Sequence, residues 1–600
     1  MNLLENSREC YLNRKKGHKP FKIATLLLIL SLTLLFFEGK SQGFLKAEGK
    51  YIVNEKGEKV LLRGMGLGGW MLQEGYMLRF PNEGQQHRIK ARIEEVIGRE
   101  KTQEFYDAWL ENHTRKIDID SMKSWGFNSV RLAMHYNLYT LPIEEEPVKG
   151  ENTWLEKGFA MTDSLLSWCK ANNMYLILDL HAAPGGQGND FNISDRDPNK
   201  PSLWDSEENQ NKMIALWTKL AERYVDEPWI AAYDLINEPN WGFVDPNDKH
   251  GLNEPKNEPL KKLLVACTEA IRKIDKKHII IIEGNGWGNN YNGMLPTWDD
   301  NMVLSFHKYW NHNNQGAIQN FLDKREKYNV PIWLGETGEN SNVWFTEAIS
   351  LMEKNEIGWA WWPLKKLGFN NPLEINLPEG YQELLNYWKG EGPKPSSDAA
   401  YKTMMQLAEN TKLENCFYHK EVIDAMFRQI NSDKAIPFKN HTVNDKIYAV
   451  DFDLGKHGVA YNDKDTADYH ISMGGDWVAW NKGRVYRNDG VDIQLCNDSE
   501  TNGYAVAAES GEWLQYSINV PKNGTYNLKI RSASADDNGK ITLITDGNEL
   551  VKDFPLSNTG SNNTWKTQEV KGVRLKKGLN LVKVQFTGNP SINYLQFSAK

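Results

Sequence analysis

Eight short apolar segments alternate with amphipathic helical patterns over residues 61–361, and this alternation limits the fold more than any other feature. The expected strands are residues 61–66, 128–132, 174–180, 230–236, 279–282, 302–306, 330–334 and 357–361. Continuous apolar strands that are joined by helices form parallel sheets covered by helices. Eight such units favour a closed α/β barrel, the (β/α)8 or TIM barrel, over an open sheet.

Polar and aromatic residues stand where the predicted strands end. The functional site of such a barrel lies at the carboxyl ends of its strands. A random set of strand ends would be less polar and less aromatic than this one. In chain order the ends supply Trp70, Arg131, His181, Asn237, Glu238, Glu283, Trp287, His307, Tyr309, Glu336 and Trp362.

Two of these residues, Glu238 and Glu336, would face each other across one barrel mouth. Carboxyl groups about 5–5.5 Å apart serve retaining glycoside hydrolysis, and groups about 6.5–9.5 Å apart serve inversion. We expect Glu238 to close a buried strand, where a partly dry environment raises a carboxyl pKa and suits a general acid. Glu336 would be the ionised nucleophile.

The other strand-end residues would support this division of roles. Arg131 beside Glu336 would keep that carboxylate charged, and we expect His307 and Tyr309 to donate hydrogen bonds to it. Asn237 would donate to a sugar 2-hydroxyl, a contact that strengthens in the transition state.

Other barrel chemistries have less support. A Schiff-base aldolase needs a strand-end lysine, and Lys308 has no evident activating partner. A metal hydrolase needs several His and Asp ligands, but no HxH or HExxH pattern occurs. The glycines of residues 63–70 match no phosphate loop and would instead permit close approach of a ligand or neighbour. We therefore expect neither a metal nor an organic cofactor in the barrel.

The ordered set resembles glycoside hydrolase family 5, the cellulase family. Asn237-Glu238-Pro239 and Glu336 look like its catalytic pair, and Arg131, His181, His307, Tyr309 and Trp362 match supporting positions over residues 45–410. The resemblance implies a retaining mechanism with Glu238 as acid/base and Glu336 as nucleophile. Residues 63–70 and 181–187 look most like the exo-β-1,3-glucanase branch. We add Trp70 and Trp287 as substrate-binding candidates.

From about residue 446 the sequence changes to short alternating strands such as 513–520, 526–530 and 579–584, which is typical of an all-β sandwich. Residues 511–516, 524–526 and 593–595 resemble a family 6 carbohydrate-binding module with a jelly-roll fold. Ala508 and Asn562 stand where the family's two sugar-clamping aromatics are expected, so Trp477, Trp480 and Tyr486 are alternative binding candidates. The resemblance also raises a structural calcium, although the acidic pattern at 448–453 is degenerate.

The N-terminus reads as a secretory signal, because a basic region precedes an apolar run at 24–37 that is short for a membrane span. We expect cleavage near Ser41 and a secreted or periplasmic protein without stable membrane insertion; an uncleaved anchor is the alternative. The 5 cysteines show no metal pattern and would be buried thiols rather than a disulfide framework. The net charge of −8 gives no support for a nucleic-acid partner.

The expected organisation is a signal peptide at 1–41, a catalytic barrel at 44–410, a helical connector at 411–442 and a sandwich module at 443–600. The expected activity is cleavage of β-glycosidic bonds in a β-glucan-like polysaccharide or oligosaccharide by a monomer. A non-catalytic carbohydrate-binding protein and a transglycosylase that uses the same carboxylates are the alternatives.

Overall fold

The computed structural model describes residues 43–600. The predicted signal peptide and Cys10 lie outside the described residues. Within 43–600, no helix is both long enough and apolar enough to cross a membrane. The four cysteines of this part of the chain are free thiols, and Cys169, Cys267 and Cys496 are buried.

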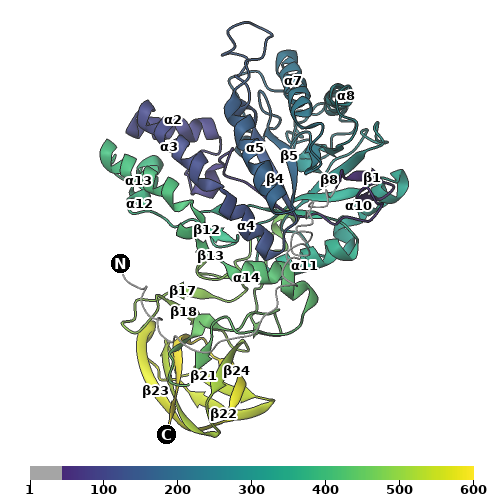
Figure 1. Ribbon diagram of the computed structural model, residues 1–600. Coiled ribbons are helices and arrows are strands. Elements are labelled where there is room, and N and C mark those ends of the chain that lie inside the picture. The colour runs from purple at the N-terminus through teal and green to yellow at the C-terminus, as the bar shows by residue number, and fades with distance from the viewer. Residues whose placement is uncertain (1–42) are drawn as a thin grey trace, which may run out of the picture. The chain divides into compact units, whose positions relative to one another are not determined.

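Eight parallel strands close into a barrel in the order β10-β3-β4-β5-β6-β7-β8-β9 (Figure 1). This confirms the predicted TIM barrel. All eight strands lie near their expected positions, and most of them extend further towards the carboxyl end. They are β3 (Arg63–Gly66), β4 (Ser129–His135), β5 (Tyr175–Ala182), β6 (Ile230–Asp234), β7 (Ile279–Glu283), β8 (Met302–Lys308), β9 (Ile332–Gly338) and β10 (Trp359–Trp362).

Amphipathic helices surround the barrel. In α7 (Glu207–Tyr224) the buried residues recur at helical spacing, and the Ser206 side chain caps the first turn by accepting from the Asn209 N–H. The other covering helices are α4 (Lys116–Trp125), α5 (Glu156–Ala171), α8 (Glu258–Arg272), α10 (Gln315–Tyr328) and α11 (Asn342–Lys354).

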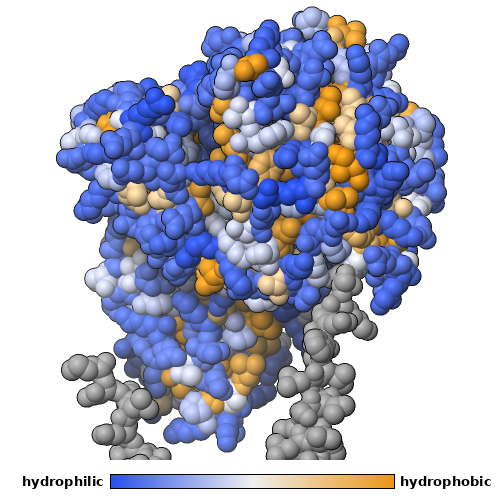
Figure 2. Space-filling view, turned by 45° about the horizontal axis from the view of Figure 1, so that its top comes forward, coloured by the Kyte–Doolittle hydropathy of each residue, from blue (hydrophilic) through white to orange (hydrophobic). Residues whose placement is uncertain are grey.

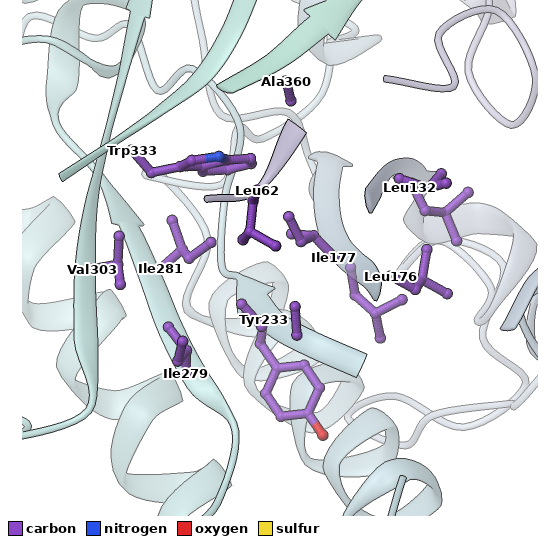
Figure 3. Packing of buried hydrophobic residues seen from close by; sticks show 14 of the residues in the cluster. Leu62, Leu132, Leu176, Ile177, Tyr233, Ile279, Ile281, Val303, Trp333 and Ala360 are labelled. Atoms are coloured by element: carbon purple, nitrogen blue, oxygen red, sulfur yellow. The ribbon is translucent and has the colours of Figure 1, made fainter. Parts of the chain in front are cut away.

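Side chains from different strands fill the barrel interior. Figure 3 shows Trp333 over Leu62, between Ile281 and Ile177, and all four are buried. Such packing removes the barrel axis from solvent, so chemistry is confined to the mouth.

A second group of helices, which the strand–helix alternation did not predict as a unit, has its own apolar core. It contains α2 (Gln86–Ile97), α3 (Arg99–His113), α12 (Tyr381–Lys389) and α13 (Ser397–Asn410) (Figure 1). Lys365 joins this group to the barrel. Its buried ammonium donates to the carbonyls of His113 and Thr411 at 2.6 and 2.8 Å and pairs with Asp118 at 2.6 Å.

The N-terminal hairpin is short. β1 (Lys46–Glu48) pairs antiparallel with β2 (Tyr51–Val53) across a tight turn at Gly49. Only a single bridge joins Val53 to Lys59. Gly49 adopts φ 59°, which favours glycine and allows the short hairpin.

The C-terminal region is the predicted β-sandwich. One sheet has the order β14-β19-β24-β21-β22 and the other the order β17-β18-β25-β20-β23. The long strands are β19 (Trp513–Val520), β20 (Gly524–Ser534), β21 (Lys540–Thr545), β22 (Asn548–Pro555), β23 (Ser561–Leu575), β24 (Gly578–Thr587) and β25 (Ser591–Ala599). The short ones are β14 (His441–Thr442), β17 (Ile493–Leu495) and β18 (Tyr504–Ala507). Their inward-facing residues form a separate apolar core.

Short helical turns lie between barrel and sandwich, including α14 (Lys420–Ile423) and a π-helical turn at Asp424–Arg428. Buried amides join the two regions directly. Asn342 donates to Asp489 at 3.0 Å, and Asn488 donates to Asn342 at 3.0 Å. The domain boundaries themselves stay predictions.

Candidate active site

Glu238 lies beyond its strand rather than at the strand end as expected. β6 ends at Asp234, and the chain then turns so that Glu238 adopts φ 44°. A left-handed backbone at a non-glycine residue costs about 1–3 kcal/mol and persists only where neighbours hold it. Here the Glu238 N–H donates to the Glu283 carboxylate at 2.7 Å, and Asn240 donates to the Glu238 carbonyl at 2.9 Å.

Glu336 lies within β9, two residues before the strand ends. Arg131 donates to Glu336 Oε2 at 2.8 Å, and the Tyr309 hydroxyl donates to Oε1 at 2.8 Å. Burial and the Glu336 charge raise the pKa of Tyr309 well above its ordinary value, so the phenol keeps its proton. Both carboxyl oxygens of Glu336 thus accept a hydrogen bond from the protein.

Glu238 and Glu336 approach each other closely. One oxygen of each lies within 4.8 Å of the other and of a His307 ring nitrogen. Burial raises the pKa of Glu238 to about 7, and the Glu336 and Glu283 charges add to this against the opposing effect of His307. Glu238 therefore titrates near neutral pH, beside a carboxyl group that Arg131 and Tyr309 bind.

His307 contacts a different glutamate from the one we predicted. Its Nδ1 lies 2.6 Å from Glu238 Oε1 and its Nε2 lies 3.1 Å from Glu283 Oε1, whereas Glu336 is bound by Arg131 and Tyr309. Burial opposes a charge on the imidazole, but the Glu283 and Glu238 carboxylates raise its pKa well above the ordinary value. The pairing of β8 with β9 shifts register between Phe306 and His307.

Arg131 is the charged centre of the site, and it is 1% exposed. Besides Glu336 it contacts three buried carboxyl groups and donates to Asn237 Oδ1 at 2.9 Å. Glu283 was expected at a strand end without a stated role, and the other two were not predicted, although an acid within an apolar strand is a signal, since it needs a buried partner. They are Asp179 at 3.2 Å, Asp234 at 2.9 Å and Glu283 at 3.0 Å.

The predicted His181, Asn237 and Trp362 lie together beside this centre. His181 Nδ1 is 2.7 Å from Asp179 Oδ2, and Asn237 Nδ2 is 3.2 Å from His181 Nε2. The Trp362 indole stacks on His181 with ring centroids 4.8 Å apart and an angle of 7°. Burial opposes charge on His181, but its carboxylate neighbours, Asp179 first, raise its pKa to about 10.

The glycines after the first strand allow Trp362 to occupy this position. A Cβ on Gly66 would lie 2.6 Å from the indole, and a Cβ on Gly68 would lie 2.5 Å from it. Close approach of a neighbour, expected from the sequence, is therefore their structural use.

The two added tryptophans have different surroundings. Trp70 is 3% exposed, belongs to the main apolar core and donates to the Leu110 carbonyl at 2.8 Å. Its indole therefore packs in the core, at the wall of a cavity of about 500 Å³. Neither Glu238 nor Glu336 lines this cavity. Trp287 is half-buried, donates to Asp190 at 3.3 Å and stacks on His250 at 4.6 Å.

Glu238, His307 and Glu336 also form the one group within residues 43–600 whose atoms are spaced to ligate a metal ion. However, His307 Nδ1 and Glu238 Oε1 already share a hydrogen bond, and the raised pKa of His307 favours the imidazolium. A metal binds the neutral ring. The trio therefore fits proton transfer better than metal binding.

In the sandwich, the carboxylates of the degenerate acidic pattern already have protein partners. Lys439 donates to Asp451 at 3.0 Å, and the Ser517 hydroxyl donates to Asp453 at 2.8 Å. The calcium site stays a prediction.

Of the aromatic binding candidates, only Trp477 is exposed, at 45%. Trp480 is 4% exposed, and the Tyr486 hydroxyl donates to Asp451. Ala508 is buried and Asn562 is exposed.

Comparison with known proteins agrees with this geometry. Residues 90–368 match the model of Cellulase (glycosyl hydrolase family 5), and residues 483–599 match that of Carbohydrate binding module (family 6). A "Beta-xylosidase" of Phanerodontia chrysosporium is 27% identical over 396 residues, which cover 59% of this chain and 78% of that protein. "Endoglucanase C" of Acetivibrio thermocellus is 27% identical over 347 residues, 48% of this chain and 92% of that protein.

Similar solved structures include an endogalactoceramidase, with a TM-score of 0.41 and 14% identity over 92% of this chain and 100% of that one. The endoglucanase Cel5A of Thermotoga maritima has a TM-score of 0.33 and 20% identity over 48% of this chain and 90% of that one. Scores this low say nothing about function. The family matches suffice: the chain is a glycoside hydrolase whose barrel belongs to glycosyl hydrolase family 5 and whose sandwich belongs to carbohydrate binding module family 6.

Proposed function

We propose that the protein hydrolyses β-glycosidic bonds of a β-glucan-like polysaccharide or oligosaccharide with retention of configuration, after export through its N-terminal segment. Glu336 is the nucleophile and Glu238 is the acid/base. The observation that carries the proposal is the unequal environment of two adjacent carboxyl groups, one protonated near neutral pH and one bound by Arg131 and Tyr309.

In the first step the Glu336 carboxylate attacks the anomeric carbon while the bond to the leaving oxygen breaks. Glu238 gives its proton to that oxygen, which leaves as an alcohol, and the sugar is bonded to Glu336. In the second step the Glu238 carboxylate takes a proton from water as the water oxygen attacks the anomeric carbon. The bond to Glu336 then breaks and both groups return to their starting states.

The spacing supports retention over inversion, because oxygens within 4.8 Å leave little room for a water between the carboxyl groups. The choice of a β-glucan-like substrate rests on membership of glycosyl hydrolase family 5 and on the names of relatives, which include "Endoglucanase C" and "Probable glucan 1,3-beta-glucosidase A".

The test compares Glu336→Gln, Glu238→Gln and the unaltered protein on aryl β-glycosides and on β-linked glucans. Each variant should lose nearly all turnover with a poor leaving group. Proton NMR of the first product should show the β-anomer, and azide should rescue Glu238→Ala to give a β-glycosyl azide. Normal turnover by both Gln variants would refute the assignment, and a first product of inverted configuration would refute retention.

The same products distinguish hydrolysis from the transglycosylase alternative. If longer oligosaccharides dominate over reducing sugar at low acceptor concentration, the protein transfers sugars rather than hydrolysing them. Binding without any turnover would favour the non-catalytic alternative.

A further inference from the structure

We propose that residues 468–487, a loop contributed by the C-terminal region, form one wall of the substrate cleft, where Trp477 stacks on a sugar of the β-glycan chain beyond the reacting unit. This inference rests on the proposed function, because it places more of the same substrate.

The loop is attached beside the strands that carry the nucleophile and its neighbours. Asn340, four residues after Glu336, donates to the Asp468 carbonyl at 2.5 Å and accepts from the Asp468 N–H at 3.1 Å. Asn488 donates to the Asn340 carbonyl at 2.9 Å. After β8, His312 stacks on Tyr469 with centroids 5.5 Å apart and an angle of 12°. Both ends of the loop are thus fixed to the carboxyl-end face of the barrel.

The middle of the loop reaches the next strand end. Trp480 packs against Phe369, which follows β10, at 6.2 Å and donates to Asn488 at 3.1 Å. The loop therefore passes the ends of β8, β9 and β10, which are neighbours in the barrel.

Trp477 is presented by this loop rather than packed into it. It remains 45% exposed, while Trp480 three residues later is 4% exposed. The Arg484 guanidinium lies 5.2 Å from the Trp477 ring centroid, and Trp480 meets the ring edge-on at 6.4 Å and 61°. These contacts hold one side of the indole and leave another side open to solvent. Figure 2 shows apolar residues scattered over a mainly hydrophilic surface, so it is the attachment beside the catalytic strands, rather than exposure alone, that makes this indole a candidate for sugar stacking.

Groups that suit sugar hydroxyls lead from the catalytic centre to Glu339, the residue before Asn340, where the loop is attached. The Tyr76 hydroxyl, on the short helix Gly75–Leu78, accepts from the Trp362 indole at 3.0 Å, and Tyr76 is 43% exposed. Lys366 lies 5.4 Å from the Tyr76 ring and pairs with Glu339 at 2.5 Å. Trp362 itself stacks on His181 in the site. The row thus continues from the catalytic centre towards the loop.

The ligand that fits this row is an uncharged sugar chain. The row offers aromatic faces together with a hydroxyl, its Lys366 and Glu339 charges are paired with each other, and the Arg484 guanidinium lies against the Trp477 ring. Aromatic faces with a few polar groups are the usual lining of such sites. Continuity with the catalytic centre favours a longer substrate over a protein partner.

The experiment uses the full chain, 4-nitrophenyl β-glucoside, and the β-1,4- or β-1,3-linked glucohexaose that the unaltered protein cleaves faster. The readout is the ratio of kcat/KM for the hexasaccharide to kcat/KM for the aryl glucoside. Trp477→Ala should lower this ratio about tenfold, and Trp477→Tyr should restore most of it. The matched control is Trp565→Ala, a half-buried tryptophan on edge strand β23, which should leave both rates unchanged.

An unchanged ratio in Trp477→Ala, or an equal loss on both substrates, would overturn the inference, because the second result indicates a structural role. Dissociation constants for the hexasaccharide in a Glu336→Gln background should rise about tenfold with Trp477→Ala. Two other results would refute the proposed function itself rather than the role of Trp477. They are normal turnover by Glu336→Gln and cleavage of neither hexasaccharide by the unaltered protein.

Discussion

Replacing His307 with glutamine tests how the site holds a proton on Glu238. The imidazolium lies 2.6 Å from Glu238 Oε1 and lowers the pKa of that carboxyl, so its removal should raise the pKa above the present value of about 7. Glutamine can still donate a hydrogen bond but carries no charge. The acid form of Glu238 should then persist to higher pH.

The magnitude follows from Coulomb's law. Two unit charges about 4 Å apart at an effective dielectric constant of about 20 interact by about 4 kcal/mol, an upper bound of about three pKa units. The substitution also removes the cation beside Glu283, so Glu283 can take up a proton. This would reduce the rise in the pKa of Glu238. We expect a rise of at least about one unit.

The assay is the pH dependence of kcat/KM on a 4-nitrophenyl β-glycoside, whose alkaline limb reports the essential acid of the free enzyme. The limb should lie near pH 7 in the unaltered protein and about one unit or more higher in His307→Gln, whatever the loss in maximal rate. Tyr309→Phe is the control, because Tyr309 contacts Glu336, and its alkaline limb should not move. An alkaline limb that stays in place or moves lower in His307→Gln would refute this account of Glu238.

Three further changes test other parts of the structure. Glu283→Gln should move the alkaline limb of kcat/KM downwards, because the Glu283 charge raises the pKa of Glu238; an upward shift would contradict this. Gly68→Ala should destabilise the fold by about 1–3 kcal/mol and raise KM, since its Cβ would lie 2.5 Å from Trp362; thermal unfolding and kinetics check this, with Gly368→Ala, whose Cβ meets Lys366 at 3.5 Å, as control. Lys365→Met should lower the free energy of unfolding by about 3–5 kcal/mol in denaturant titrations, because Asp118 stays buried without its partner, whereas Lys149→Met, at an exposed pair, should have little effect.

The barrel was predictable because its strands are buried on both faces and therefore read as continuous apolar runs. The helical group beside it was not predicted as a unit, since α2 and α3 interrupt the alternation after β3. A signal was present in α2, where Ile89, Ile93, Val96 and Ile97 recur at helical spacing and are buried. The spacing alone does not predict what packs against this apolar face of α2. The partners are α12 and α13, which follow almost 300 residues later in the chain.

At the site, strand-end position identified the residues but not their pairing. Tyr309, which follows β8, contacts Glu336 on the neighbouring β9, whereas Arg131 on β4 reaches Glu336 although β3 and β10 lie between their strands. His307 was assigned to Glu336 by the same reasoning, but a register shift in β8 turns it towards Glu238. Glu238 itself departs from the strand, so its position depends on the turn after Asp234 and on Glu283.

Charge balance across the whole cluster explains why Glu238 holds a proton. Three cations, Arg131, His181 and His307, share the buried site with six carboxyl groups. The pKa values of three of these carboxyl groups are raised: Glu74 to about 8, Glu238 to about 7 and Asp234 well above its ordinary range, each chiefly by burial. The other three are Asp179, Glu283 and Glu336. All six carboxyl groups lie 3.7 Å or less from a cation, so contact alone does not decide which of them holds a proton.

Six carboxyl groups outnumber three cations, so the buried cluster is neutral only while three of the six keep their protons. Burial penalises any uncompensated charge by several kcal/mol. The pKa of Glu238 is about 7 and that of Glu74 is about 8. Of these two groups, Glu238 is therefore the one whose proton moves near neutral pH. Each cation removed from the cluster should therefore require one more proton within it. The acid function of Glu238 thus depends on Arg131 and His181 as well as on the His307 it touches.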